Sequence, residues 1–518
     1  MAMKACDGVP TVKYGRVWPE MWTQCLGKEI RQWDPNGWLL DGSHSICEAH
    51  FALSAKFLGL DQAVEFACSN KLDYVYFEVD SKTMIDSLNT SSTLNDWKCL
   101  HISENILFKK NCLRNIIFSW VPIEALLENV LLVFFILVCV AESDSKVKFF
   151  NVKDYGATAD GKTDNSQAFL KAWKEACEWE GKARFWIPEG TFQLNPVIFD
   201  GPCKGFMAFV IKGVLIAPAG PFTDKWINFR YVNNLAVFGG GKLVGQGATA
   251  WHHNDCSNNP NCRQLASNIR FDFITNGRVH HIHSIDSKSS HIVIFGCKNM
   301  NFTKIRISAP EDSPNTDGIK IGKSFGINIT RTAISTGDDC IAMISGTRTV
   351  RISEVMCGPG HGISVGSLGR GDGEEDVEDI VVKNCTFDGT SQGVRIKTWA
   401  NPLSKPLKAY NFLYEDIVMN NVRNPIIIDQ QYCPFPRCYT QVSSQVEISK
   451  VRYKNIQGSS SSEEAITLNC SKDKPCQDIT LEDINLWPHP SSNLNKLTSS
   501  CSNVNGASYG KQNPPGCF

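Results

Sequence analysis

A chain of 518 residues is too long for one ordinary hydrophobic core, so we expect two or more domains. Apolar residues make up 42% and charged residues 20%, a balance typical of globular proteins. The formal net charge of -1 provides no global basic bias, which argues against a nucleic-acid-binding protein.

Residues 1–120 are predicted to form part of an α/β domain, with a strand, a helix, the β-rich "YVYFEVDS" and another helix. Residues 20–90 resemble a ribonuclease H-like domain of plant retroelement-derived genes. The best marker is the strand that ends in Asp80. Ala52 stands where that class usually carries Glu, and no first-strand Asp precedes "IRQWDPNGWLL". Since this chemistry needs several carboxylates for two metals, we interpret the segment as a degenerate remnant. A working nuclease and a chance α/β fragment are the alternatives.

Residues 121–141 hold an internal apolar segment whose run from Val130 to Ala141 is unbroken. A short apolar core followed by a small residue is typical of a secretory signal peptide. The run is too short for a stable membrane span, which needs about 20 residues. We therefore expect cleavage near Ala141 and a secreted, extracellular domain over residues 142–518, with the upstream part joined as a fusion. The sequence leaves open whether that fusion is a real protein or a gene-model artefact.

The region after the signal-like segment begins with one predicted helix, "NSQAFLKAWKEACEWEG", in which Phe169, Trp173 and Cys177 lie one turn apart. Beyond it, β-rich octets with alternating faces recur about 23–39 residues apart, a period typical of a solenoid. They start at Met300, Ile327, Val350, Ile380, Phe412, Val451 and Ile479. A β-sandwich would instead show hairpin turns every 8–12 residues. We predict an all-β, right-handed parallel β-helix that stacks apolar residues inside and leaves a groove on one sheet.

The cysteines support a secretory route, because fourteen of the 21 lie within residues 142–518. Several form close pairs without zinc-site spacing: Cys256/Cys262, Cys433/Cys438 and Cys470/Cys476. Short loops closed by disulfides are the better interpretation, although connectivity stays open at this point. Asn-x-Ser/Thr triplets at Asn301, Asn328, Asn384 and Asn469 fit a glycoprotein, but each is a weak signal.

Polar motifs recur at the spacing of one coil. "SPNTDG" carries Asn315 and Asp317, "GDDC" carries Asp338 and Asp339, and "GHGIS" carries His361. Asp339 follows Asp317 by 22 positions, and His361 follows Asp339 by another 22. This step places the side chains on one face of the solenoid. Like charges so close disfavour joint ionisation, so one carboxyl is expected to have a raised pKa. A protonated acid beside ionised carboxylates is the requirement of glycosidic cleavage.

Two coils further on, "RIKTW" supplies Arg395 and Lys397, which strand alternation places on one face. These cations either pair with the acids or hold a substrate carboxylate. Tyr432 is expected one coil later, where it can stack on or bond to a sugar. Each motif alone has an ordinary structural explanation, such as a turn for Asp-Gly or a solvated face for the cations. Their joint order and spacing indicate a functional site.

Together "SPNTDG", "GDDC", "GHGIS" and "RIK" resemble the polygalacturonases, family 28 of the glycoside hydrolases, over residues 147–518. The resemblance implies a parallel β-helix and inverting hydrolysis of α-1,4-galacturonosidic bonds in pectin. It implies Asp338 as general acid, Asp317 and Asp339 as joint base, and His361 as support for the acid. Substrate contacts would come from Asn315, Arg395, Lys397 and Tyr432. The "VKFFNVKDYGATADGKTD" segment is most similar to pollen-type exopolygalacturonases.

The resemblance also implies disulfides Cys177–Cys203, Cys340–Cys357, Cys470–Cys476 and Cys501–Cys517. It implies pectin as the substrate and no metal or other cofactor. We also expect a monomer with no nucleic-acid partner. Exo action is the expectation and endo action the alternative, because the outcome depends on loops that close the groove. Other candidate functions are a rhamnogalacturonan or xylogalacturonan hydrolase, a calcium-dependent pectate lyase, a nucleic-acid-processing protein and a structural wall protein.

Overall fold

The computed structural model divides into two compact units, Met1–Asp144 and Ser145–Phe518. It describes residues 147–518 apart from 223–224, 256–258, 260, 263–264 and 435–441, and in the first unit the strands β1 (Ala2–Lys4), β2 (Tyr74–Val79) and β3 (Asn115–Trp120). Strand β2 pairs in parallel with β3 and antiparallel with β1. This confirms the predicted strand in "YVYFEVDS". The other predicted elements of residues 1–120 and the signal-like run lie outside the described residues.

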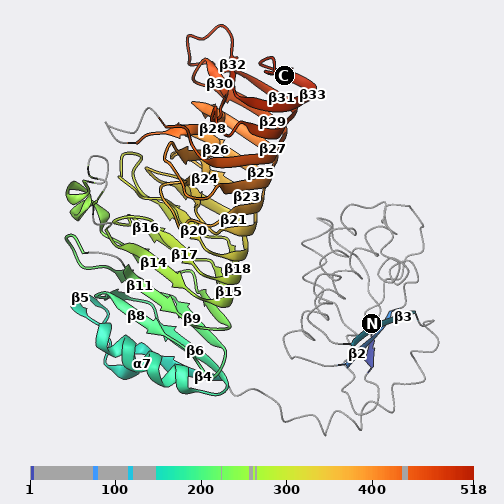
Figure 1. Cartoon of the computed structure of the whole chain (residues 1–518). Coiled ribbons are helices and arrows are strands. Elements are labelled where there is room, and N and C mark those ends of the chain that lie inside the picture. The colour runs from blue at the N-terminus through green and yellow to red at the C-terminus, as the bar shows by residue number, and fades with distance from the viewer. Residues whose placement is uncertain are drawn as a thin grey trace, which may run out of the picture. The chain divides into compact units, whose positions relative to one another are not determined.

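The second unit is built from parallel strands that form two sheets (Figure 1). The 11-stranded sheet contains β8 (Val197–Asp200), β11 (Lys225–Arg230), β14 (Ser267–Asp272), β17 (Ile292–Phe295), β20 (Ile319–Gly322), β22 (Ile341–Met343), β24 (Ile363–Leu368), β26 (Gln392–Trp399), β28 (Asn424–Tyr432), β30 (Glu464–Asn469) and β32 (Thr498–Ser502).

The 19-stranded sheet supplies the rest of each coil. It contains β4 (Val147–Asn151), β5 (Asp160–Asp164), β6 (Lys182–Ile187), β7 (Thr191–Gln193), β9 (Met207–Ile211), β10 (Val214–Ile216), β12 (Leu235–Phe238), β13 (Lys242–Val244), β15 (Thr275–His280), β16 (His283–Ile285), β18 (Lys298–Thr303), β19 (Arg306–Ser308), β21 (Phe325–Ser335), β23 (Arg348–Cys357), β25 (Val377–Asp388), β27 (Leu407–Val422), β29 (Val446–Ser460), β31 (Cys476–Pro488) and β33 (Val504–Asn513).

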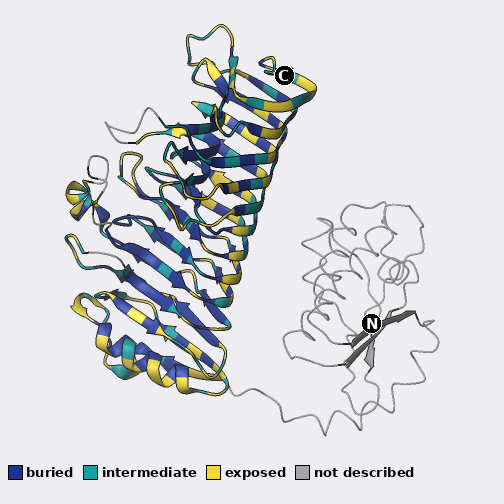
Figure 2. Ribbon diagram, viewed as in Figure 1, coloured by how far each residue is buried: buried dark blue, intermediate teal, exposed yellow. Residues whose placement is uncertain are grey.

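The repeat predicted from the octets is confirmed residue by residue. Each octet's first residue pairs with the first residue of the next octet, from Met300 with Ile327 through to Val451 with Ile479. All of these first residues are buried. Because every coil returns its apolar residues to the same register, the interior becomes a continuous apolar stack, seen as the dark blue strand positions of Figure 2. The second unit is a parallel β-helix, as predicted.

Residues with positive φ bend each coil. Early coils place two short strands in the 19-stranded sheet, such as β18 and β19, with Lys304 between them at φ 53°. From β21 onward the two strands merge into one, and Arg331 (φ 49°) and Glu354 (φ 53°) occupy the equivalent bends. A left-handed residue turns the strand without interrupting the ladder on either side.

Helix α7 (Ser166–Glu178) lies against the first coils (Figure 1). The predicted apolar face is confirmed, since Phe169, Trp173 and Cys177 are buried. The Trp173 ring packs 4.9 Å from that of Phe199 and 5.6 Å from that of Phe229. The helix therefore covers the otherwise open N-terminal end of the stack. Short 3-10 helices are η1 (Val152–Tyr155), η2 (Gly247–Thr249) and η3 (Trp251–His253).

All four disulfides implied by the resemblance are present, namely Cys177–Cys203, Cys340–Cys357, Cys470–Cys476 and Cys501–Cys517. Cys262 and Cys433 are also disulfide-bonded, whereas Cys297 and Cys385 are free and buried. Among the described residues, none of the helices has the length and apolar character needed to span a bilayer.

Candidate active site

The 11-stranded sheet brings the predicted acids together. Ile319, Ile341 and Ile363 pair across β20, β22 and β24, so the residues two places before them fall in one column. Those residues are Asp317, Asp339 and His361. The 22-residue spacing is therefore one coil, as predicted. The column lies where each chain segment enters the sheet, just before its strand begins.

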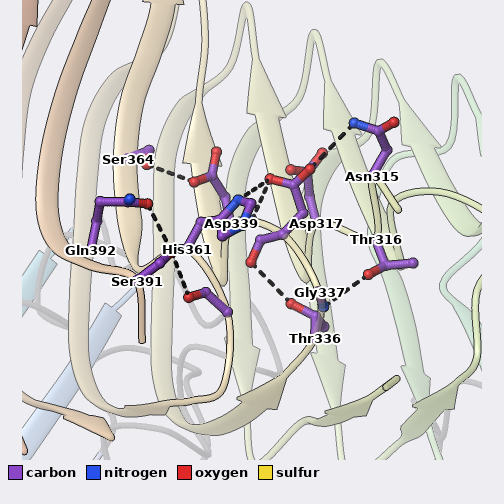
Figure 3. Close-up of polar contacts among 12 residues, drawn as sticks. Asn315, Thr316, Asp317, Thr336, Gly337, Asp339, His361, Ser364, Ser391 and Gln392 are labelled. Atoms are coloured by element: carbon purple, nitrogen blue, oxygen red, sulfur yellow. Dashed lines mark hydrogen bonds and ion pairs between the residues drawn. The ribbon is translucent and has the colours of Figure 1, made fainter. Parts of the chain in front are cut away.

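Asp339 is the most buried acid and has three partners. Its side chain is 2% exposed, and its two oxygens accept from Arg395 Nη2 at 2.6 Å and from Lys397 Nζ at 2.7 Å. Ser364 Oγ donates to Oδ1 at 2.7 Å (Figure 3). Burial raises the pKa of Asp339, but the charges of Lys397 and Arg395 outweigh it and lower the pKa below its usual value. Asp339 is held as a carboxylate.

Asp338 lies between His361 and Asn315. His361 Nδ1 lies 3.1 Å from Asp338 Oδ1, and Asn315 Nδ2 donates to Oδ2 at 3.3 Å. Burial raises the pKa of Asp338, but the hydrogen bond and charge of His361, with Lys397 and Lys320, lower it. Burial lowers the pKa of His361 and its bond to Asp338 raises it, with a net increase. A proton can therefore pass between His361 Nδ1 and Asp338 Oδ1.

Asp317 has the raised pKa that the sequence predicted for one carboxyl. Its side chain is 7% exposed, and burial is the largest cause of the increase. The charges of Asp338 and Asp339 add to it, while Lys320 opposes it. Asp317 Oδ2 accepts from Lys320 Nζ at 2.7 Å and from Ser290 Oγ at 2.9 Å. In this structure the raised pKa belongs to Asp317 and not to Asp338.

Backbone contacts hold the loops that carry these acids (Figure 3). Thr316 Oγ1 accepts from the N–H of Gly337 at 3.1 Å, and Thr336 Oγ1 donates to the carbonyl of Asp338 at 3.2 Å. A Cβ on Gly337 would lie 2.1 Å from the carbonyl oxygen of Ser313. Glycine is therefore required where neighbouring loops meet, and the acids start from a fixed backbone.

Arg395 and Lys397 lie on β26, which pairs directly with β24. The sequence-based placement two coils beyond the histidine motif is wrong, because a single 31-residue coil joins Ile363 to its partner Val394 and carries a longer loop. The predicted shared face is confirmed by their common contact with Asp339. Of the two alternatives left by the sequence, the structure shows the pairing of both cations with the acid. Contact with a substrate carboxylate stays a prediction.

Tyr432 ends β28, one coil after β26, as predicted. Lys397 Nζ lies 5.3 Å from the centre of its ring, and the ring of Trp399 packs edge-on at 5.5 Å. Burial raises the pKa of Tyr432 to about 12, so its hydroxyl stays protonated at neutral pH. The residue borders the acid cluster through Lys397.

All the predicted site residues therefore gather in one region, but the sequence analysis missed Lys320, Ser290 and Ser364. Lys320, Ser364 and Arg395 lie in one outward column, since Lys320 pairs with Ala342, Ala342 with Ser364, and Ser364 with Arg395. Aligning the strands of this sheet, instead of the octets of the other sheet, would have exposed the column.

Asp338, Asp339 and His361 offer atoms within 4.8 Å of one another, a geometry that can suit a metal ion. Both oxygens of Asp339 already bond cationic side chains. A divalent ion would have to displace them, and Arg395 and Lys397 would repel it. Among the described residues, this cluster is better matched to a proton and to anionic groups than to a cation.

The model of the glycosyl hydrolases family 28 matches residues 177–512. The chain belongs to this family. A second model, described as reverse transcriptase-like, matches residues 30–126. That match agrees with the ribonuclease H-like resemblance predicted for the first part of the chain.

Among curated relatives, an exopolygalacturonase of Platanus acerifolia is 46% identical over 369 residues, covering 70% of this chain and 96% of that protein. A polygalacturonase of Gossypium barbadense is 45% identical, covering 75% and 96%. An exopolygalacturonase of Oenothera organensis is 46% identical, covering 68% and 98%.

Solved structures share the fold at lower identity. An exopolygalacturonase from Thermotoga maritima gives a TM-score of 0.56 at 18% identity, covering 71% of this chain and 92% of that one. A polygalacturonase from Erwinia carotovora gives 0.54 at 21% identity, covering 70% and 98%. The prediction of a right-handed parallel β-helix is confirmed.

Proposed function

We propose that the unit formed by residues 142–518 hydrolyses α-1,4-galacturonosidic bonds of pectin with inversion at the anomeric carbon. The observation that carries the proposal is the cluster of three acids, in which each acid pairs with its own basic side chains. Family membership and relatives named polygalacturonase and exopolygalacturonase support it. Inverting hydrolysis needs an acid on one side of the bond and a base that activates water on the other.

Asp338 is the general acid in this proposal. The proton between His361 Nδ1 and Asp338 Oδ1 passes to the glycosidic oxygen as the bond to the leaving sugar breaks. Asp317 and Asp339 together take a proton from the water that attacks the anomeric carbon. Asp339 stays ionised because two cations outweigh its burial. Asp317 is the more basic of the two because Lys320 offsets its burial only in part. The products are two sugars, one with a new hemiacetal hydroxyl.

A polyanionic substrate is matched by the charge of the cluster. The cations Lys320, Arg395 and Lys397 balance the three carboxylates, and a protonated His361 leaves one positive charge in excess. A uronate carboxylate can then enter without net repulsion and can share the bidentate donors of Arg395. Asn315 and Tyr432 are the neutral sugar-binding groups of the proposal.

Exo action is the form we favour, and endo action is the alternative. Two of the three relatives described above are named exopolygalacturonase. In addition, Asn254 of the loop between β13 and β14 bonds Asn315 at 3.1 Å. A loop that reaches the acid cluster favours exo action, because exo action depends on loops that close the groove. The fold neighbours include an endo-xylogalacturonan hydrolase from Aspergillus tubingensis, with a TM-score of 0.56 and 20% identity. That polymer therefore belongs in the substrate comparison.

The test uses polygalacturonate, xylogalacturonan and rhamnogalacturonan with reducing-sugar detection and product sizing over time. We expect hydrolysis of polygalacturonate to the monomer alone, which is unaffected by EDTA and yields no unsaturated uronate absorbance. A spread of oligomers would establish endo action. EDTA-sensitive formation of unsaturated products, or wild-type activity in Asp338→Asn, would overturn the proposal.

We further propose that this unit is a secreted monomer released by cleavage near Ala141, with residues 1–120 as a degenerate appendage. Its disulfides support an oxidising compartment. Mass spectrometry of the native N-terminus tests the cleavage, and a start near Glu142 is expected. Peptides that join residues 1–120 to the hydrolase would contradict it. Light scattering of the purified unit tests the monomer.

A further inference from the structure

The loop between β13 and β14 touches the candidate active site at one described position. Asn254 Nδ2 donates to Asn315 Oδ1 at 3.1 Å and to the carbonyl of Pro314 at 3.4 Å. These are two contacts with the segment that carries Asn315, made by a residue 61 positions earlier in the chain. None of the sequence motifs pointed to Asn254.

The first part of this loop is firmly anchored. Lys288 Nζ donates to the carbonyls of Gly245 at 2.6 Å and Gln246 at 3.3 Å. Trp251 Nε1 donates to the carbonyl of Ser287 at 3.0 Å. Lys288 is 1% exposed, and its Nζ also lies 5.0 Å from the centre of the Phe222 ring. Removing an ammonium from water costs free energy, and the carbonyl bonds of Lys288 to this loop offset part of that cost.

The contact from Asn254 decides which way the Asn315 amide faces. An amide has one acceptor atom and one donor atom, on opposite sides. With Oδ1 bonded to Asn254, the NH₂ group must face Asp338, where it donates to Oδ2 at 3.3 Å. Asn315 has φ 54°, a left-handed backbone conformation that Asn tolerates. The reverse orientation would place two oxygens against each other at Asp338.

We propose that Asn254 is a positioning residue for the reaction, acting through Asn315 on the acid Asp338. The effect on catalysis rests on the proposed function, whereas the hydrogen bonds from Asn254 to Asn315 and from Asn315 to Asp338 do not depend on it. Asn254 holds the NH₂ of Asn315 on Oδ2 of Asp338. Oδ1 is left to His361 and to the backbone N–H of Asp339. The acid's two oxygens are thereby given distinct partners before a sugar binds.

A double-mutant cycle tests this chain on polygalacturonate. We expect Asn254→Ala to lower kcat/KM roughly three- to tenfold, the loss typical of one hydrogen bond. In an Asn315→Ala background the same change should have less than about a twofold effect. Asn259→Ala is the matched control, because Asn259 lies in the same loop and bonds Asp255 at 2.7 Å instead of the site. It should leave kcat/KM unchanged.

Asn254→Asp separates a positioning role from a purely structural one, because only a positioning role predicts a change in the titration of His361. A carboxylate at this position cannot donate, so the Asn315 amide turns and presents its oxygen to Asp338. The ionised form of Asp338 is then less stable, and the NMR titration of the His361 ring should move to lower pH. Asn259→Asp adds the same charge to the same loop and should leave that titration in place.

Equal losses from Asn254→Ala in both backgrounds, or an unmoved His361 titration in Asn254→Asp, would overturn the inference. The two proposals fail separately. A wild-type protein that binds but does not cleave polygalacturonate refutes the proposed function alone, and the titration of His361 in Asn254→Asp and Asn259→Asp still decides the role of Asn254.

Discussion

Replacing Lys397 by Met tests whether Asp339 depends on its cations. The pair is buried, with side chains 8% and 2% exposed and Nζ 2.7 Å from Oδ2. Removing one partner of a buried pair costs about 3–5 kcal/mol, because the other charge is left without compensation. Arg395 and Ser364 still bond Oδ1, so we expect the lower end, about 3 kcal/mol, in urea unfolding at pH 7.

The pH dependence of this loss is set by the lowered pKa of Asp339. Such a group contributes stability above its unfolded pKa, and the contribution disappears as pH falls through the folded pKa. The difference between wild type and Lys397→Met should thus shrink below pH 3.8. Lys383→Met is the control, since Lys383 pairs with Glu415 at the surface and should cost less than about 1 kcal/mol. Equal losses in the two variants, or a difference that does not change with pH, would refute the reasoning.

Further changes probe other parts of the molecule. Asp338→Asn should lower kcat roughly 10²- to 10⁴-fold with unchanged unfolding, as measured by sugar release and urea titration, and a smaller loss would remove Asp338 from the acid role. His361→Gln should move the basic limb of the pH–rate profile to lower pH, because the raised pKa of His361 keeps it protonated above pH 6.5. Ala at both Cys340 and Cys357 should cost about 3 kcal/mol in urea unfolding, the loop-closure entropy for a separation of 17 residues; no loss would contradict that model. Burial lowers the pKa of Lys288 from 10.5 to about 8. As pH rises from about 8 to 10.5, the unfolding free energy of wild type should therefore increase relative to that of Lys288→Met. A difference between the two that does not change with pH would contradict the costly burial of this ammonium.

Periodicity in the sequence was sufficient to predict the β-helix and the clustering of the acids. Successive coils of the solenoid stack in register, so residues separated by the length of one coil lie in one column. This is why the 22-residue step between Asp317, Asp339 and His361 was informative, and why the octet starts paired in register. Where coil length changed, the prediction failed: the longer loop before β26 misplaced Arg395 by one coil.

Which charges meet was decided only by the tertiary structure. The acid motifs, being chemically alike, gave no means to predict that burial would raise the pKa of Asp317 while Lys397 and Arg395 lowered that of Asp339. Lys320 and Asn254 were missed for the same reason, since neither belongs to a motif and each acts by position. Sequence spacing thus determined the column of functional residues. Desolvation and contacts between loops far apart in the chain, which depend on three-dimensional packing, determined the protonation and partner of each residue.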